Sequence, residues 1–195
     1  MKIGVLALQG DFSEHIFKLS GIGVPSVEVR LPSDLEGLSG VLLPGGETTT
    51  IRKLADAYGL IGALRDFGKD HALWGTCAGA IILAKHIASE EAVLGLMDIT
   101  VERNSFGRQV DSFEVDLNIS SLPSHDHNSS LPFRGVFIRS PAILKTGPGV
   151  EILSRLPDGT IVAARQNRWL ATCFHPELVD DNRLHQLFLE MAGAS

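Results

Sequence analysis

The chain has 195 residues, of which 44% are hydrophobic and 21% are charged, and this length predicts one well-buried domain over residues 1–195. Its formal net charge of −6 argues against a nucleic-acid-binding protein, which would carry a basic face. Its apolar runs are shorter than the roughly 18 residues that cross a bilayer, and two cysteines cannot form a disulfide framework, so we expect a cytoplasmic protein with free thiols.

The first half of the chain alternates short apolar runs with stretches whose apolar residues have helical spacing. The predicted strands are residues 2–8, 26–31, 41–43 and 71–74, and the predicted helices are residues 12–20 and 48–68, the second interrupted at Tyr58-Gly59. Strands that are apolar throughout and separated by helices indicate a parallel sheet covered on both faces.

The second half predicts many strands with short connections, several of them antiparallel. They are residues 98–102, 110–119, 134–138, 150–154, 160–165 and 169–174, and a last helix follows over 180–192. The stretch from Ser120 to Leu131 is rich in Ser, His and Asn and is predicted to be a surface loop. Its His125-Asp126-His127 could suggest a metal site, but such loops are more often solvated surface, and we assign no metal. The whole pattern predicts an α/β fold.

The segment Gly75-Thr76-Cys77-Ala78-Gly79 directly follows a predicted strand and precedes the apolar helical run Ala80-Ile81-Ile82-Leu83-Ala84. This pattern is typical of a nucleophile elbow, with cysteine in the position of serine. Small flanking residues permit a sharp turn, and the start of the following helix favours a thiolate and offers amide groups to an oxyanion. The alternative is a strand-to-helix turn that holds a small buried cysteine.

A cysteine nucleophile requires a histidine base, and the base requires an orienting partner. His175 follows the predicted strand 169–174, and Pro176 stops that strand, so the imidazole is expected at a sheet edge. Glu177 lies two residues further on and could hold the imidazole tautomer. In isolation a surface turn explains these residues better, but beside the cysteine elbow they predict a Cys77-His175-Glu177 triad.

A glycine pair lies in the segment Pro44-Gly45-Gly46-Glu47-Thr48-Thr49-Thr50, after the strand at 41–43. Paired glycines allow a ligand to approach the backbone closely, and the threonines can cap the helix that follows. The spacing is not that of a phosphate-binding loop. Gly46 could supply an oxyanion-hole amide opposite Ala78, whereas a tight turn with a helix cap is the simpler alternative.

Two further residues lie near these motifs in the sequence. Strand alternation places Cys173 on the same side as His175, which could bring it near the site, although a small buried core thiol is the more common role. His15 is expected on the first helix, facing a partner.

Together these motifs resemble the class I glutamine amidotransferases, and within that class the glutaminase subunits of the ribose-5-phosphate-dependent pyridoxal 5'-phosphate synthases. The similarity covers nearly the whole chain. Other members of the class usually carry glutamine at the position of Ile81, and the residue found here matches this subgroup instead. Thr48 departs from the family, which usually has serine at that position. The residues that carry the resemblance are 4–10 with Glu14-His15, 44–50, 75–82, 101–109, 135–139 and 174–178.

The resemblance implies a flavodoxin-like three-layer sandwich with a mostly parallel central sheet and additional antiparallel strands in the second half. It also implies that Cys77 attacks the side-chain amide of L-glutamine, that His175 moves the protons and that Glu177 orients His175. Without the resemblance, Arg103 and Arg139 would be predicted to be surface ion-pair partners. The resemblance implies no cofactor. It assigns Gly46 and Ala78 to the oxyanion hole, and it assigns substrate binding to Gly46, Glu47, Thr48, Arg103, Ile138 and Arg139.

The resemblance further implies a partner chain. Ammonia released from glutamine would pass to a separate synthase subunit, which makes pyridoxal 5'-phosphate from ribose 5-phosphate and glyceraldehyde 3-phosphate in a hetero-oligomeric complex. Nucleic acids and membranes are not expected partners. The alternatives that stay open are an amidotransferase subunit of another pathway, a related cysteine hydrolase, and a non-catalytic regulatory module.

Overall fold

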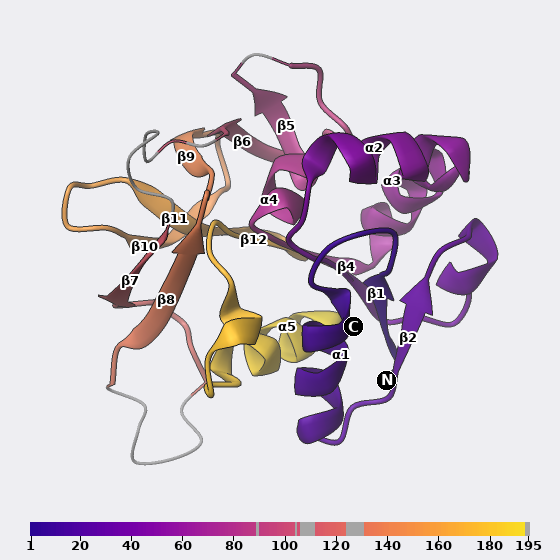
Figure 1. The fold of residues 1–195 in the computed structure, drawn as a ribbon, viewed down its shortest axis with the longest axis horizontal. Coiled ribbons are helices and arrows are strands. Elements are labelled where there is room, and N and C mark those ends of the chain that lie inside the picture. Colours follow the sequence, from indigo (N-terminus) through magenta and orange to yellow (C-terminus); the bar gives the residue numbers. More distant parts are fainter. Residues whose placement is uncertain (89, 104, 106–111, 124–130, 194–195) are drawn as a thin grey trace.

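Residues 1–88, 90–103, 105, 112–123 and 131–193 are described by the computed structural model. A ten-stranded sheet runs through the molecule, and helices cover both faces of its parallel half (Figure 1). Residues 110 and 111 of one predicted strand, and the His125-Asp126-His127 segment, lie outside the described residues. Among the described residues, no helix combines the length and the apolar character needed to cross a membrane.

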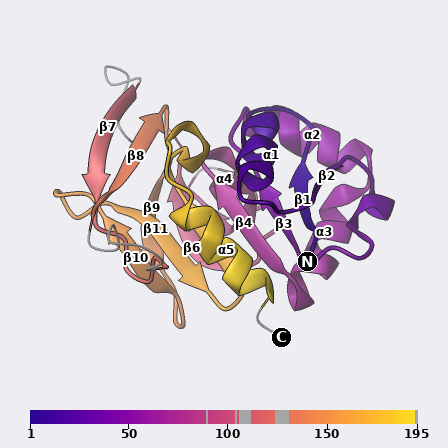
Figure 2. The same cartoon turned by 90° about the horizontal axis from the view of Figure 1, so that it is seen from below.

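One side of the sheet is parallel and runs in the order β2-β1-β3-β4-β12. Its strands are β1 (Ile3–Leu6), β2 (Ser26–Val29), β3 (Gly40–Leu43), β4 (Ala72–Thr76) and β12 (Trp169–Thr172). The helices are α1 (Phe12–Gly21), α2 (Thr48–Ala57), α3 (Leu60–Asp70), α4 (Ala78–Leu83) and α5 (Arg183–Gly193). Helices α1 and α5 cover one face, as Figure 2 shows, and α2, α3 and α4 cover the other.

The sheet continues beyond β12 through the antiparallel neighbours β11, β9 and β6, and β5 then pairs with β6 in parallel. These strands are β5 (Ala84–Ile87), β6 (Met97–Glu102), β9 (Ala142–Thr146) and β11 (Ile161–Gln166), with β10 (Glu151–Arg155) paired to β11. A separate antiparallel pair is formed by β7 (Ser112–Leu117) and β8 (Phe133–Ile138), and two short 3-10 helices are η1 (Pro32–Leu35) and η2 (Pro176–Leu178).

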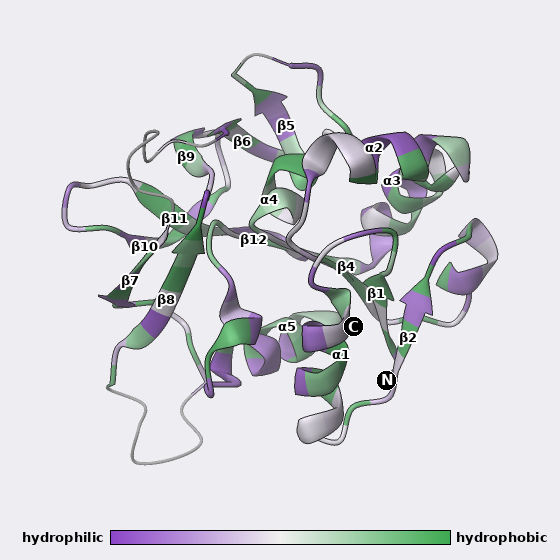
Figure 3. Ribbon diagram, in the orientation of Figure 1, coloured by the Kyte–Doolittle hydropathy of each residue, from purple (hydrophilic) through white to green (hydrophobic). Residues whose placement is uncertain are grey.

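The core lies along both faces of the parallel strands. Every residue of β1, β3 and β4 is buried, because helices cover the sheet on both sides. Hydrophobic residues accordingly gather along the central strands in Figure 3. On the face covered by α1 and α5, Trp74 packs against Phe188, with ring centroids 5.6 Å apart.

The predicted α/β fold with a mixed sheet is confirmed, but two strands were missed. Ala84 was assigned to the helical run after the elbow, and it instead begins β5, where it pairs with Met97. Strand β9 was not predicted at all. The predicted break at Tyr58-Gly59 is confirmed, because Gly59 has a φ of 70° and separates α2 from α3.

Candidate active site

Cys77 lies on a strained turn between β4 and α4. Its φ of 48° and ψ of −108° fall in a region that non-glycine residues rarely occupy. The Cys77 amide donates to the Thr172 carbonyl at 2.8 Å, which fastens the turn to β12. A Cβ added at Gly75 would collide with the Gly79 carbonyl, and one at Gly79 would collide with the Leu43 carbonyl. The small residues around the cysteine are therefore a steric requirement of this turn.

His175 and Glu177 reach Cys77 from the neighbouring strand. Because β4 and β12 are parallel and adjacent, with Thr76 opposite Thr172, the residues that follow them meet at the same sheet edge. His175 Nδ1 lies 2.6 Å from Glu177 Oε1, which leaves Nε2 for the cysteine. Both side chains are almost completely buried. The structure thus brings the three predicted triad residues together.

Hydrogen bonds among Cys77, His175 and Glu177 favour the charged form of His175. Burial lowers the pKa of His175, but hydrogen bonds to Cys77 and Glu177 outweigh that effect and raise the pKa to about 10. Burial raises the pKa of the Glu177 carboxyl, while the hydrogen bond from His175 acts in the opposite direction. His175 is consequently an imidazolium at neutral pH, positioned to balance a Cys77 thiolate and to give a proton to a leaving group.

The glycine loop is fixed by residues of the β1–α1 connection, a contact that the sequence analysis missed. Gln9 Oε1 accepts from the Glu47 amide at 2.7 Å, and the Asp11 amide donates to the Gly45 carbonyl at 3.2 Å. Gly46 has a φ of 150°, which favours glycine. The peptide bond between Gly45 and Gly46 is trans, so its carbonyl and its N–H point in opposite directions. Because the Gly45 carbonyl faces the Asp11 amide, the Gly46 amide points away from Asp11. Ala78 is the first residue of α4.

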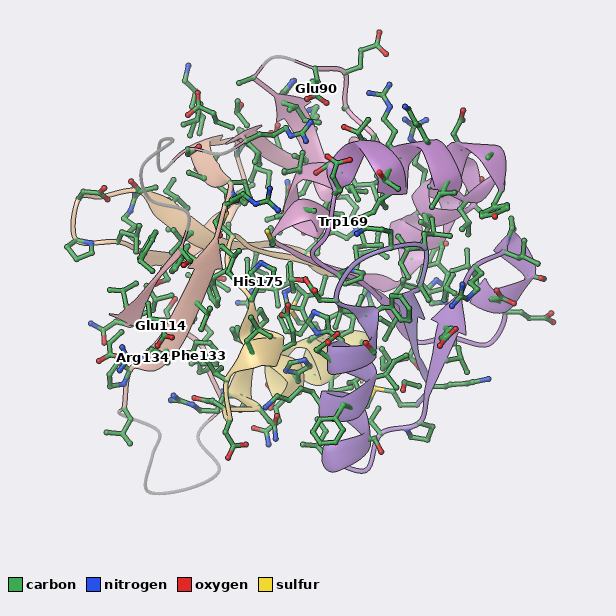
Figure 4. The ribbon with its side chains drawn as sticks, viewed as in Figure 1. Glu90, Glu114, Phe133, Arg134, Trp169 and His175 are labelled. Atoms are coloured by element: carbon green, nitrogen blue, oxygen red, sulfur yellow. The ribbon has the colours of Figure 1, made fainter. Side chains whose placement is uncertain are left out.

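A cavity of about 390 Å³ lies in front of Cys77. Arg103 in it is paired with Glu47 at 3.1 Å and with Glu90 at 2.5 Å, so its guanidinium already holds two carboxylates. Glu90 lies at the outer rim of the molecule in Figure 4, whereas His175 lies near its centre. The cavity is lined by Gln9, Gly10, Asp11, Gly46, Glu47, Thr48, Cys77, Ala78, Ile81, Arg103, Ile138, Arg139, Pro141 and His175.

All of the predicted substrate-binding residues line this cavity. Thr48 is buried, whereas Ile138 and Arg139 are exposed, and Arg139 has a φ of 44°. The Ile138 amide donates to Ser140 Oγ at 3.0 Å. Another hollow, of about 610 Å³, lies beside β10 and contains none of the predicted site residues.

Asp11 also approaches the histidine, with Oδ2 3.5 Å from His175 Nδ1. Asp11, His175 and Glu177 each offer one ligand atom, and these atoms lie within 4.8 Å of one another. Such a group could hold a cation, but His175 Nδ1 is already bonded to Glu177 at 2.6 Å. The geometry therefore fits an oriented base better than a metal site, and the sequence-based expectation of no metal stays as it was.

His15 departs from its expected surroundings, whereas Cys173 does not. His15 is on α1 as predicted, but it is completely buried and cannot face a partner. The helix presents it inward because it finds polar contacts there, with Thr76 and His185. Cys173 is a buried free thiol, and burial together with the nearby Cys77 raises its pKa. Its burial agrees with the predicted core position, and the effect of Cys77 on its pKa agrees with the predicted nearness to the site.

Comparison with protein families identifies the chain. A model of the SNO glutamine amidotransferase family matches residues 5–194. The chain belongs to this family. It is 54% identical to a Dehalococcoides mccartyi protein named pyridoxal 5'-phosphate synthase subunit PdxT, across 98% of this chain and 97% of that protein. It is 52% identical to a Thermus thermophilus protein of the same name, with the same two coverages.

Solved structures agree with the family assignment. A crystal structure of a glutamine amidotransferase superposes with a TM-score of 0.90 at 49% identity, and the match covers 98% of this chain and 99% of that one. PurLQS from Thermotoga maritima superposes with a TM-score of 0.73 at 15% identity, with 97% of each chain covered. At that identity the second likeness shows the fold alone.

Proposed function

We propose that this member of the SNO family hydrolyses L-glutamine to L-glutamate and ammonia, with Cys77 as nucleophile, His175 as proton carrier and Glu177 as the residue that orients His175. The observation that carries the proposal is the elbow: a cysteine at a φ of 48° meets a buried imidazole whose other nitrogen is bonded to a carboxylate. This arrangement contains the parts that thiol catalysis requires.

In the proposed reaction, the Cys77 thiolate attacks the carboxamide carbon of glutamine and a C–S bond forms. The His175 imidazolium gives its proton to the amide nitrogen, the C–N bond breaks, and ammonia leaves a thioester behind. Water then attacks the thioester while neutral His175 accepts a proton. The C–S bond breaks, glutamate departs, and the thiolate and imidazolium are restored.

The developing oxyanion would be stabilised by the amides of Gly46 and Ala78, and the Ala78 amide lies at the start of α4. Arg103 and Arg139 would hold the substrate carboxylate, since guanidinium groups bind carboxylates through paired hydrogen bonds. Glu47, Thr48 and the Ile138 backbone would contact the remaining polar groups. Support for these roles comes from their common position around the 390 Å³ cavity.

The proposal includes a partner, a synthase subunit that receives the ammonia and makes pyridoxal 5'-phosphate. The relatives named as PdxT subunits match this chain over 98% of its length, which supports the same division of labour. We also propose that residues 1–195 act as one amidotransferase domain, because strands from both halves of the chain join one sheet. The cytoplasm is the proposed location, because a reducing compartment keeps thiols free.

The test is an ammonia-release assay on L-glutamine, with and without the synthase subunit. We expect low activity of the isolated chain and a clear rise when the synthase is added. Cys77→Ala should abolish turnover, whereas Cys173→Ala, which removes the other buried thiol, should retain it. Glutamate production by the Cys77→Ala variant would refute the triad, and full activity of the isolated chain would refute dependence on the synthase.

Labelling would separate glutaminase activity from the alternative of a cysteine hydrolase or peptidase. An electrophile that mimics glutamine should modify Cys77 covalently, and excess glutamine should protect it. Cleavage of peptide substrates without reaction toward the glutamine mimic would favour the peptidase.

A further inference from the structure

A buried polar network continues beyond Glu177, on the side away from Cys77. His15 Nε2 lies 3.3 Å from Glu177 Oε2 and 3.2 Å from Thr76 Oγ1. His15 Nδ1 lies 3.1 Å from His185 Nε2. Glu177 is nearly buried, and the other three residues are fully buried. The network joins α1, β4, η2 and α5 directly behind the proposed catalytic residues.

The second carboxylate oxygen of Glu177, Oε2, is buried without a well-aligned hydrogen-bond donor among the described residues. Oε1 is bonded to His175, whereas buried Oε2 makes no aligned hydrogen bond within the described part of the chain. Leaving a buried carboxylate oxygen without a donor is costly. His15 Nε2 is a nitrogen close enough to supply a proton, and a small ring rotation would share its N–H between Thr76 and Glu177.

The tautomers form a consistent chain. Burial lowers the pKa of His15 well below its usual value and that of His185 to about 3, so each ring is neutral and carries one N–H. If His185 donates from Nε2 to His15 Nδ1, then His15 must carry its own proton on Nε2, toward Glu177. His185 Nδ1 is then a bare acceptor, in agreement with its having no bonded partner among the described residues.

We propose that His15 is a positioning residue that donates from Nε2 to Glu177 Oε2 and holds the carboxylate in the rotamer that orients His175. His185 fixes the tautomer of His15. The proposal rests on the proposed function insofar as it concerns glutamine turnover. His15 itself does not touch the substrate cavity and acts through Glu177.

The charged and titratable groups around the network define what a pH measurement reports. Glu177 is faced by His175 from its own turn, by His15 from α1, and at longer range by Asp11 from the β1–α1 connection. His185 is faced by Lys18 from α1 and by Asp181, which precedes α5. Within the described residues, the ion-pair partner of Glu177 Oε2 is His15.

The test compares His15→Gln with His15→Asn. The amide nitrogen of Gln can reach the place of Nε2 and keep the donor to Glu177, whereas Asn reaches only the place of Nδ1 and loses it. Trp169→Phe is the stability control, because it removes a 2.8 Å hydrogen bond to the Gly68 carbonyl at the start of β12 (Trp169 and His175 are labelled in Figure 4).

The decisive measurement is the pH profile of Cys77 alkylation by iodoacetamide in the isolated chain. Without the donor, Glu177 should take up a proton more readily, so we expect His15→Asn to move the acid limb upward by about one pH unit. We also expect the kcat for glutamine, measured with the synthase, to fall about tenfold with KM unchanged. His15→Gln should restore most of both effects, and Trp169→Phe should produce neither.

A wild-type alkylation profile in folded His15→Asn would overturn the proposal, as would equal losses in the Gln and Asn variants. If His15→Asn does not fold, His15→Gln still decides, because a profile shifted as far as one unit in that variant would contradict the donor role. Failure of the wild-type chain to release ammonia with the synthase would refute the proposed function alone, since the alkylation profile does not depend on glutamine.

Discussion

The two walls of the candidate site are built differently. The wall that carries Cys77, His175 and Glu177 is buried, and it is held by strand ends and backbone hydrogen bonds of the parallel half. The opposite wall carries Arg103 and Arg139, which come from the antiparallel half or the turns beside it and are accessible to solvent. Arg103 is held there by side-chain ion pairs with Glu47 and Glu90.

This difference suggests a division between fixed chemistry and adjustable recognition. A nucleophile and its base must keep their geometry within a fraction of an ångström, which a packed sheet edge can supply. Side chains such as Arg103, with an exposed fraction of 27%, can exchange protein carboxylates for a substrate carboxylate at little cost. Changes in the buried wall should therefore have larger effects than changes in the accessible wall.

Outside the triad, the largest expected effect comes from Gly79→Ala. The added methyl would collide with the Leu43 carbonyl, so we expect a loss of about 3 kcal/mol in the free energy of unfolding and about a hundredfold loss of glutaminase activity. The control is Gly62→Ala on α3, where a Cβ meets open space and should stabilise the helix by about 0.5–1 kcal/mol. Urea denaturation and ammonia release would measure both, and a fully active Gly79→Ala chain would contradict the rigid wall.

The buried wall should also make stability depend on pH. Unfolded His15 and His185 bind protons near pH 6.5, whereas in the folded chain burial lowers the pKa of His15 and lowers that of His185 to about 3. The contribution of each histidine is therefore complete above pH 6.5 and is lost as the pH falls, toward about 3 in the case of His185, at up to about 1.4 kcal/mol per pH unit for each histidine. Glu177 opposes this trend at the acid end, because burial raises its pKa.

Urea denaturation at pH 7, 6 and 5 would measure this slope. His185→Phe should make it shallower, and replacing the exposed His86 with Gln should leave it as in the wild type. A slope that does not change in His185→Phe would show that this ring does not remain neutral in the folded chain.

A moderate effect is expected for Arg103→Lys in the accessible wall. Lysine keeps the charge but cannot make paired hydrogen bonds to a carboxylate, so KM for glutamine should rise about tenfold with kcat nearly unchanged. Arg52→Lys is the matched control, because Arg52 pairs with Glu91 outside the cavity. Steady-state kinetics with the synthase would measure both, and a fall in kcat alone would place Arg103 in the chemical step instead.

The smallest effect is expected for Glu90→Gln. Glu90 holds Arg103 in the structure and would compete with the substrate carboxylate, so its neutralisation should lower KM by about two- to fivefold. Glu91→Gln, at the neighbouring position, should leave KM unchanged. An increase in KM for Glu90→Gln would mean that Glu90 holds Arg103 in its binding position and does not compete with glutamine.

The parallel half could be predicted well from the sequence because its strands are apolar throughout and its turns carry glycine. The elbow could also be recognised in the sequence. Gly79 approaches the Leu43 carbonyl so closely that only small residues fit around Cys77, and this run of small residues marks the turn. His175 and Glu177 could be named because Pro176 marks the end of the strand. Their catalytic roles remain predictions.

The missed features depend on contacts between distant segments. Strand β5 follows α4 without a glycine or proline, so local residues do not mark where the helix ends. His15 is polar in an amphipathic helix and was expected at the surface, but its partners Thr76 and His185 lie 61 and 170 residues away. Gln9 was missed for the same reason, because its acceptor role depends on the Glu47 amide.

The position of β12 between β4 and β11 has a consequence for the nascent chain. Strand β4, which leads to the cysteine, stays unpaired on one side until Trp169–Thr172 has been synthesised. His175 follows only three residues later. During translation the thiol therefore exists without its base for most of the time, so the growing polypeptide cannot carry an activated nucleophile before it can also complete its sheet.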